Sequence, residues 1–586
     1  MARRTALLTA LALVAYVAVG CAGDGVTPVA PSAFIRVVSP NGGERWIPGI
    51  DHEIVWVSQY VGGTVCIEYS TDNFVSDVHT IATDEPNDGS FVWENIPSDP
   101  LDTVRVRISW TGFPGVSDVS DDDFRTGDFG WARTWGGTDG DRGYAVAIDH
   151  AGSIYVAGYF RGTTDFDPNS GDSHTSIGGS DVYLVKFDPS GSFKWVRTWG
   201  GPEGTYSTGV AADGSGSVYV VGYFWGTADF DPGYGDPHSS NGACDVFLSK
   251  FDMSGDFEWA RTWGEPYGDY GTGVAVDDSG GVYVTGYFYD KPDSDSGEGD
   301  PEPPYGTQDV FLLKYNSSGN LDWERTWGGR RADYGYGVAT DRSGSIYVTG
   351  DFEWRADFNP GGGDSRIMHG GPDVFLSKFD SWGNFEWART WGSEHWDAGN
   401  AVAADSSGNV YVTGYFSDPV DFDPDGGCPH ASNAVNDVFL SKFDSSGNFE
   451  WARTWGAAYF DQSRAVAADG SGHVYVTGYF SYTVDFNPDG GDPHSASGYA
   501  DVFLSRFDTS GNFEWARTWG GSHIYAGDYG HGVCTDGHGN AFVTGWFRNT
   551  VDFSPSDPVC QGEVDEHASS GAGDSFLVKY LPDGCW

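Results

Sequence analysis

Trp131-Ala-Arg-Thr-Trp-Gly136 is the first copy of a motif that recurs along most of this chain. Each copy begins 64 residues after the previous one, with its first tryptophan at Trp131, Trp195, Trp259, Trp323, Trp387, Trp451 and Trp515. A fixed period is typical of stacked units that cannot bury their apolar faces alone. The motif therefore predicts one repeat domain over residues 128–586.

Each copy divides into four short segments with the composition of β-strands. In the fifth copy they cover residues 401–405, 410–416, 437–444 and 449–455. Ser-Ser-Gly-Asn occupies 406–409 and again 445–448, where glycine can take a positive φ and close a tight hairpin. Four antiparallel strands per copy and seven copies predict an all-β, seven-bladed β-propeller.

The repeated phrases YVTGYF, DFDP, DVFLSKFD and FEWARTWG resemble the SBBP family, a seven-bladed propeller repeat of bacterial proteins. The resemblance covers essentially all of 129–586 and implies the fold, but it implies little about function. The segment 129–136 precedes any blade of its own, and the last copy ends soon after a third strand at 575–580. We therefore expect the N-terminal strand to complete the last blade, which would remove an exposed sheet edge.

Residues 34–127 lack the repeat and have alternating apolar runs, such as 34–38, 53–57, 65–69 and 104–108. These runs predict the half-buried strands of a β-sandwich. The phrases SPNGGERW, IEYSTDNF, GSFVWENIP and SDVSDDDF resemble an Ig-like module related to the N-terminal domain of fungal cell-wall glucan-synthesis proteins. The resemblance implies a role in adhesion or spacing.

The first residues have the pattern of an export signal. Arg3 and Arg4 precede an apolar stretch that ends near residue 20, so 1–20 is predicted to be a signal peptide. Ala18-Val19-Gly20-Cys21 resembles the lipobox of bacterial lipoproteins, although that family usually has Leu in place of Ala18. The resemblance implies lipidation of Cys21, with 21–33 as a flexible tether. We expect an exported bacterial lipoprotein of the outer membrane or cell surface, in contact with the membrane only through its lipid; ordinary secretion is the alternative.

The net charge of −52 excludes nucleic acid as a natural partner, because phosphate binding needs clustered Lys and Arg. Solubility, divalent-cation binding and adaptation to salt remain three interpretations of that charge. The six cysteines after Cys21 show no C-x-x-C spacing, which argues against zinc. Whether Cys560 and Cys585 form a disulfide stays open.

Residues that recur in every copy are predicted to be structural. Trp131, Arg133 and Trp135 share one strand face, so the arginine is expected to stack on both indoles. Each third strand also has one basic residue, for example Lys442. We expect it to pair between blades with carboxylates such as Asp405 and Asp444.

An acidic loop lies between the second and third strands of most copies. In the fifth and sixth copies it matches D-x-[DN]-x-D-G, the start of a calcium loop. The glutamate expected at position 12 is absent, and solvated turns are the alternative. The candidate calcium ligands are Asp421, Asp423, Asp425, Asp485, Asn487, Asp489, Asp165, Asp167 and Asn169. Histidines recur in these loops at His174, His238, His430 and His494, as solvated side chains or as weak metal ligands.

The connections between blades vary from copy to copy, and variable loops on a repeated frame often bind ligands. Their aromatic residues are candidates for contact with a sugar or a peptide, with packing over the rim as the alternative. These candidates are Tyr206, Tyr270, Tyr334, Trp396, Tyr459 and Tyr525.

No single-copy nucleophile, metal triad or carboxylate pair is evident, so we expect a protein that is not an enzyme. The leading hypothesis is a non-catalytic, surface-anchored propeller that binds a protein or a glycan. One alternative is a carbohydrate-active enzyme, a glycosidase or lyase, with carboxylates at the top face of the propeller. Another is an envelope assembly lipoprotein, which rests on fold analogy alone.

Overall fold

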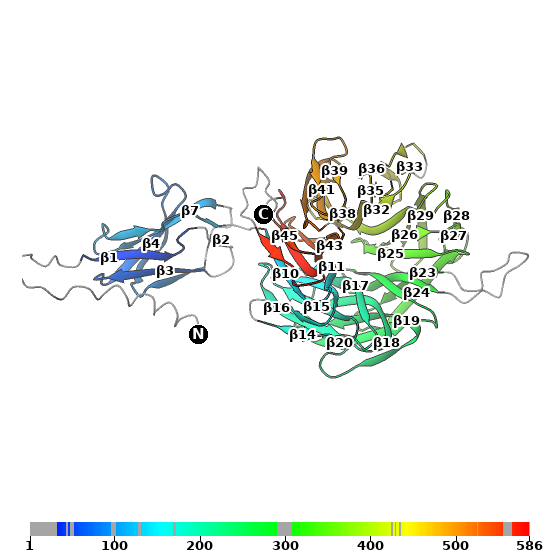
Figure 1. Ribbon diagram of the computed structural model, residues 1–586, viewed down its shortest axis with the longest axis horizontal. Coiled ribbons are helices and arrows are strands. Elements are labelled where there is room, and N and C mark those ends of the chain that lie inside the picture. Colours follow the sequence, from blue (N-terminus) through cyan, green and yellow to red (C-terminus); the bar gives the residue numbers. More distant parts are fainter. Residues whose placement is uncertain are drawn as a thin grey trace, which may run out of the picture. The chain divides into compact units, whose positions relative to one another are not determined.

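Every regular element in the computed structural model is a β-strand, which confirms the predicted all-β class (Figure 1). The structure describes residues 32–42, 45–46, 52–94, 96, 101–126, 130–167, 171–289, 308–423, 426–427, 429–432, 435–523, 525–554 and 565–584. Cys21, Asn169, Asp425, Cys560 and Cys585 lie outside these ranges, as does the predicted signal peptide. Within the same ranges no helix is long and apolar enough to cross a membrane. The chain divides into two units, Met1–Asp128 and Phe129–Trp586.

The first unit contains two sheets with a shared apolar core. One sheet is formed by β1 (Phe34–Ser39), β3 (His52–Gln59) and β6 (Ser90–Trp93). The other has the order β2 (Arg45–Trp46), β9 (Phe124–Thr126), β7 (Leu101–Trp110), β4 (Thr64–Ser70) and β5 (His79–Pro86), and β8 (Ser117–Val119) also pairs with β7. Val65 and Ile67 alternate with more exposed residues along β4 and are buried with Ile54 and Trp56. The period of two in the sequence therefore separates the core face from the solvent face.

The second unit contains seven sets of four antiparallel strands within the described residues. In sheet order these are β11 (Arg142–Ile148), β12 (Ile154–Phe160), β15 (Asp181–Phe187), β16 (Phe193–Trp199); β17 (Thr205–Ala212), β18 (Val218–Asp229), β19 (Pro237–Phe251), β20 (Phe257–Trp263); β21 (Tyr270–Val276), β22 (Val282–Tyr289), β23 (Gln308–Tyr315), β24 (Leu321–Gly329); β25 (Asp333–Thr340), β26 (Ile346–Phe352), β29 (Asp373–Phe379), β30 (Phe385–Trp391); β31 (Ala398–Ala404), β32 (Val410–Phe416), β35 (Asp437–Phe443), β36 (Phe449–Trp455); β37 (Gln462–Ala468), β38 (His473–Phe480), β41 (Asp501–Asp508), β42 (Phe513–Trp519); and β43 (Tyr529–Thr535), β44 (Ala541–Phe547), β47 (Asp574–Tyr580), β10 (Trp131–Gly137).

The first strands of these sets contact one another in a closed cycle. The contacts run from β11 through β17, β21, β25, β31, β37 and β43, and β43 contacts β11 again. The two ends of the repeat meet where β10 pairs with β47, and Trp131 lies opposite Lys579. Trp195 lies opposite Lys186 in the same way within a continuous sheet. The pairing of the N-terminal strand with residues 575–580, predicted from the sequence, is thus present with the register of the other sheets.

The acidic segments form small hairpins instead of the predicted loops. Phe422 of the DFDP phrase is buried, with its ring 5.3 Å from the ring of Phe439 on the third strand. This anchor holds the segment against the sheet, and the backbone on either side pairs. The hairpins are β13 (Thr163–Asp165) with β14 (Ser173–Thr175), β27 (Arg355–Asp357) with β28 (Ser365–Ile367), β33 (Val420–Asp421) with β34 (Pro429–His430), β39 (Thr483–Asp485) with β40 (Pro493–Ser495), and β45 (Thr550–Asp552) with β46 (Glu566–Ala568). Of these, β13 also pairs with β10 and β27 with β24.

The repeated W-x-R segment joins each sheet to the next, in a different way from the one predicted. The Arg133 guanidinium lies 4.9 Å from the Trp131 ring centre, and its Nε donates a 2.7 Å hydrogen bond to the carbonyl of Gly191 in the next sheet. Trp135 packs instead on Tyr183 and Phe187. The prediction of stacking on both indoles is therefore wrong, because the turn carbonyl holds the guanidinium over the first indole only.

Lys442 has closer partners than the predicted aspartates. Its Nζ lies 2.8 Å from Glu450 on the neighbouring strand and donates a 2.9 Å hydrogen bond to the carbonyl of Thr509 in the next sheet. The Asp405 carboxylate accepts backbone N–H groups of its own turn, from Ser407 and Asn409. The turn needs these acceptors to close, so the aspartate forms no close ion pair with the lysine; in the first sheet the equivalent Asp149 acts on Lys186 through its charge alone.

Candidate functional site

An aromatic belt follows the first two strands of successive sheets, on pairs of residues that face each other across the strands. Tyr206 lies opposite Tyr223, and Tyr270 lies opposite Tyr287. Rings of neighbouring sheets also meet, with the Tyr223 and Tyr270 centroids 4.8 Å apart. Such pairs stabilise beyond the area that they bury. Contacts of this kind connect Tyr159, Tyr206, Tyr223, Tyr270, Tyr287 and Tyr334, and separately Tyr479, Tyr529 and Trp546.

The belt is interrupted at Asp351 in β26. The corresponding residue in the other six sheets is aromatic, at Tyr159, Tyr223, Tyr287, Tyr415, Tyr479 and Trp546. The first strand of the next sheet has Ala398 where Tyr206, Tyr270 and Tyr334 stand in theirs. Two rings are thus missing from adjacent sheets at the same place, and one of them is replaced by a carboxylate.

Asp351 is buried and has no basic partner. Its exposed fraction is 1%, and no described donor makes a well-formed hydrogen bond to either carboxylate oxygen. The Tyr336 hydroxyl and the Trp396 indole N–H face it and favour its charged form, but burial dominates and raises the pKa of Asp351 to about 7. A buried carboxylate without a partner is costly, so an isolated one in a repeated frame marks a functional candidate.

Tyr336 belongs to a second variable set, formed by a β-bulge in each first strand. The pairing register shifts between Gly335 and Gly337, so Tyr336 is the extra residue. Bulges redirect side chains and are frequent next to functional sites. The seven bulge residues are Tyr144, Thr208, Thr272, Tyr336, Asn400, Arg464 and His531.

Most bulge residues contact the neighbouring first strand. Thr208 donates a 2.7 Å hydrogen bond to the carbonyl of Gly271, and Asn400 donates one of 2.7 Å to that of Ser463. The His531 ring lies 4.6 Å from Tyr144, and burial together with nearby arginines lowers the pKa of His531 to about 3. These residues vary in type while the backbone around them repeats, which is the pattern expected of a site that distinguishes one blade from another.

The six predicted ligand-binding aromatics separate into two groups. Tyr206, Tyr270 and Tyr334 lie on first strands and pack within the aromatic belt, so their placement on connecting loops is wrong. The connecting loops before these three tyrosines are shorter than predicted, because the cross-strand tyrosine pairs extend the first strands. Trp396, Tyr459 and Tyr525 do lie on connections, with exposed fractions of 54%, 49% and 85%.

The candidate calcium ligands use their oxygens within their own turns. Asp485 accepts backbone N–H groups from Gly491 and Asp492, both at 2.9 Å, and its pKa is lowered mainly by these bonds against the effect of burial. Asn487 accepts the N–H of Asp489 at 3.0 Å. Asp421 accepts the N–H groups of Asp423 and Gly427. In the part of the chain that the structure describes, no three His, Cys, Asp or Glu side chains lie close enough to hold a metal ion. Calcium binding stays a prediction.

The recurring histidines fasten the acidic hairpins to the sheets. The Nδ1 of His174 lies 2.8 Å from the Thr198 hydroxyl, and its ring meets Phe166 edge to face. His238, His430 and His494 make the same contact with the threonine of their own W-x-R-T-W segment. His567 makes it with Thr134 across the junction of β47 and β10. The interpretation of these histidines as freely solvated is therefore wrong.

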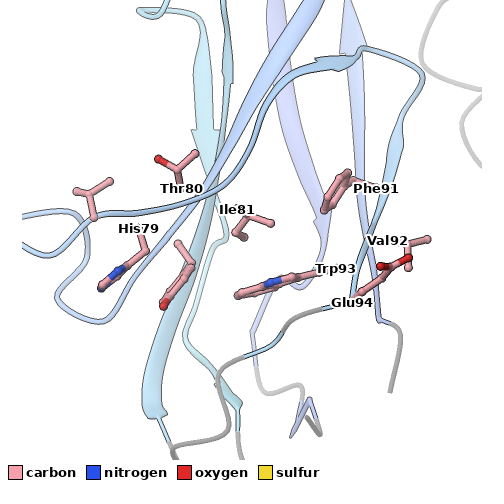
Figure 2. Close-up of a pocket in the computed structure, with 9 residues that line it drawn as sticks. His79, Thr80, Ile81, Phe91, Val92, Trp93 and Glu94 are labelled. Carbon is pink, nitrogen blue, oxygen red and sulfur yellow. The ribbon is translucent and has the colours of Figure 1, made fainter. Parts of the chain in front are cut away.

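A pocket lies in the first unit, between the edge strands of its two sheets (Figure 2). His79, Thr80 and Ile81 come from β5, and Phe91, Val92 and Trp93 come from β6. The His79 ring stacks on Tyr69 at 4.6 Å and its Nε2 lies 2.6 Å from Asp77. The pocket presents an aromatic wall but no cluster of groups that would support chemistry.

The comparisons with known proteins agree with the repeat. Residues 258–287 and 326–351 match the SBBP β-propeller repeat family. An uncharacterized WD repeat-containing protein of Acanthamoeba polyphaga mimivirus is 23% identical over 432 residues, which cover 61% of this chain and 30% of that protein. The regulatory protein FlaEY of Caulobacter vibrioides is 29% identical over 251 residues, which cover 39% of this chain and 24% of FlaEY. The chain spans less than a third of the length of either relative.

Solved structures with some likeness include a gluconolactonase of Xanthomonas campestris, at 12% identity and a TM-score of 0.26 over 59% of this chain and 95% of that one. The Synechocystis apocarotenoid oxygenase is 10% identical with a TM-score of 0.25, over 69% of this chain and 89% of that one. Likeness at this level carries no argument about activity. The family match, the WD-repeat relative and the all-β repeat structure together define a β-propeller repeat protein.

Asp351 and the bulge residues are missing from the sites predicted from sequence. The signal for Asp351 is nonetheless present in the repeat, because DF at 351–352 stands where the other copies have YF or WF. The bulge residues have a similar signal. When the seven copies are aligned with one another, the residue type at the bulge position varies, while the residues on either side of it are small in every copy. A comparison of the seven copies column by column would find both.

Proposed function

We propose that this β-propeller repeat protein is a non-catalytic binding scaffold of seven blades, and that the loop end of its ring binds a protein or a glycan. The observation that carries the proposal is a stacked pair of exposed tyrosines, Tyr459 and Tyr482. Their ring centroids are 4.7 Å apart with an interplanar angle of 21°, and their exposed fractions are 49% and 59%. Two parallel exposed rings offer a flat apolar surface with hydroxyl groups at its edge, which suits a sugar ring or an apolar side chain.

The backbone of Tyr482 supports a binding role. Its φ is +60°, in a position that Gly162 and Gly226 occupy in other sheets with φ of +64° and +60°. A bulky residue in this region costs about 1–2 kcal/mol, and an exposed ring recovers little of that by burial. Left-handed backbone at a bulky residue is characteristic of functional positions. Trp354 stands at the same position with φ of +67° and 42% of its surface exposed, and Asp418 and Asn549 have this conformation in their own sheets.

The test compares ligand binding by the intact chain and by two sets of variants. Glycan arrays and immobilised candidate proteins are probed with the wild type, with Tyr459→Ala/Tyr482→Ala and with Tyr234→Ala. Tyr234 is 99% exposed and forms no ring contact within the described residues, so it is the matched control. We expect at least a tenfold loss for the double variant and none for the control. Equal binding by all three proteins would refute the proposal.

We further propose that export and lipidation of Cys21 hold the propeller at the outer membrane or cell surface, with the two-sheet first unit as an Ig-like spacer. The resemblances of the N-terminal sequence support this arrangement. Class averages of the purified protein by electron microscopy would test the number of blades, with six or eight lobes as the contrary result. Turnover of polysaccharides by the purified protein would favour the carbohydrate-active enzyme, and recovery with outer-membrane proteins would favour the assembly lipoprotein.

A further inference from the structure

The break in the aromatic belt has an unusual combination of groups. Asp351 is surrounded by aromatic side chains: Tyr334 lies directly opposite it across β25 and β26, and Tyr336 and Trp396 face its carboxylate. Tyr415 of the next sheet is also close enough for its pKa to be raised by the Asp351 charge, after the larger effect of burial. The charged groups that interact with Asp351 within the described residues, Glu353 and Asp333, are also acidic.

No positive charge within the described residues balances this carboxylate. The Tyr336 hydroxyl and the Trp396 indole N–H act on it as neutral donors, neither in a well-formed hydrogen bond, and no basic side chain is paired with it there. One other belt position has a charged residue, Arg142, and there the charge is a cation that lies against aromatic rings. Arg142 lies opposite Tyr159, and its guanidinium is 4.5 Å from the Trp546 ring centre. The belt therefore already accommodates a cation against its rings, but at Asp351 it presents an anion among rings and lacks the cation.

We infer that Asp351, Tyr336 and Trp396 form a binding site for an organic ammonium group. The carboxylate would supply the counter-charge, and the tyrosine and indole rings would hold the cation by their negative faces while limiting water. Trp396 lies on the connection between β30 and β31, with 54% of its surface exposed, so one wall of the site is in contact with solvent. Ala398, which is smaller, stands at the position that a tyrosine occupies in other sheets.

This inference goes beyond the proposed function and does not rest on the Tyr459–Tyr482 pair. The same chemistry is available from a quaternary ammonium compound or from the primary amine of a lysine side chain. The two sources differ in hydrogen bonding, because only the primary ammonium can donate to the carboxylate. If both a quaternary ammonium compound and a primary amine bind, charge and ring contacts contribute more to affinity than hydrogen bonding does. If only the primary amine binds, the ligand is lysine-like.

The experiment is calorimetric titration of the intact protein with choline chloride and with n-butylammonium chloride. The neutral isostere 3,3-dimethylbutan-1-ol reports binding that needs no charge. The variants are Asp351→Asn, which keeps the shape, and Asp351→Tyr, which restores the residue of the other sheets. Asp278→Asn removes the same charge from an exposed turn and is the control. Melting temperatures are measured for each variant, so that loss of the fold is separated from loss of the site.

We expect at least one ammonium probe to bind the wild type and the Asp278→Asn control equally. Both Asp351 variants should bind at least tenfold more weakly while melting at or above the wild-type temperature, because they remove an unpaired buried carboxylate. Trp396→Ala should weaken binding several-fold. Binding of neither probe, equal binding by Asp351→Asn, or equal binding of the neutral isostere would each overturn the inference.

Discussion

A single methyl group at Gly447 should report how strongly consecutive sheets are joined. Gly447 has φ of +78° in the turn between β35 and β36, where its N–H bonds to the carbonyl of Asp444. A Cβ added there would lie 2.9 Å from Cδ2 and Cε2 of Trp387 and 3.1 Å from the Arg389 guanidinium of the preceding sheet. The same arrangement recurs at each sheet junction, from Trp131 over Gly191 to Trp515 over Gly584.

Gly280 provides a matched control for the cost of placing an alanine in a left-handed backbone conformation. It has φ of +82° in the same kind of turn, closed by the corresponding hydrogen bond to Asp277, and its added Cβ would meet Ser317 Cβ at an ordinary 3.6 Å. Gly280→Ala should therefore cost only the left-handed conformation, about 1 kcal/mol. Gly447→Ala adds the displacement of a packed indole, typically about 1–3 kcal/mol, for a total of about 2–4 kcal/mol.

The assay is urea denaturation of both purified variants and the wild type, followed by tryptophan fluorescence and circular dichroism. We expect the midpoint to fall for both variants, by at least twice as much for Gly447→Ala. Equal shifts would refute the argument that the indole-on-glycine contact joins the sheets. A change in slope as well as midpoint would indicate that one sheet junction opens before the rest.

Four further predictions concern the ring, the unusual carboxylate, the anchor and the acidic hairpins. Deleting residues 129–137 should leave the edge of β47 unpaired and cause concentration-dependent aggregation in light scattering that the wild type does not show, and scattering equal to that of the wild type would argue against closure by β10. Burial raises the pKa of Asp351 to about 7, so between about pH 4 and 7 the folded state binds a proton that the unfolded state has lost. The wild type should therefore lose stability relative to Asp351→Asn as pH rises through that range, by up to about 4 kcal/mol. Urea denaturation of both proteins at pH 4.5 and 8 tests this, and an unchanged difference in their stability would contradict it. Cys21→Ser should abolish incorporation of labelled fatty acid and release the protein from membranes, and retention of the label would exclude lipidation at this residue. If the hairpins bind calcium, the melting temperature should rise with calcium but not sodium and the rise should disappear in Asp421→Ala/Asp423→Ala; no rise would leave these aspartates as turn-closing residues.

The local features of this protein follow from its sequence because they depend on short-range periodicity. The 64-residue spacing of Trp131 and its equivalents defines the repeat, and alternation and turn glycines place the strands of the fifth copy within a few residues of β31, β32, β35 and β36. The pairing of residues 129–136 with 575–580 follows from the count of strands, since an incomplete last sheet and a spare first strand have one consistent arrangement.

The contacts that distinguish one sheet from another were decided by tertiary structure. Arg133 bonds to Gly191 and Lys442 to Thr509, and the sequence does not predict these partners because they lie on surfaces that meet only when the sheets pack. Asp351 differs from its equivalents by one letter in the sequence. Its burial depends on rings from β25, from the connection before β31 and from β32, and no cation lies beside it among the described residues. A carboxylate has its ordinary chemistry in water, and only the exclusion of water by neighbouring sheets turns this one into a candidate site.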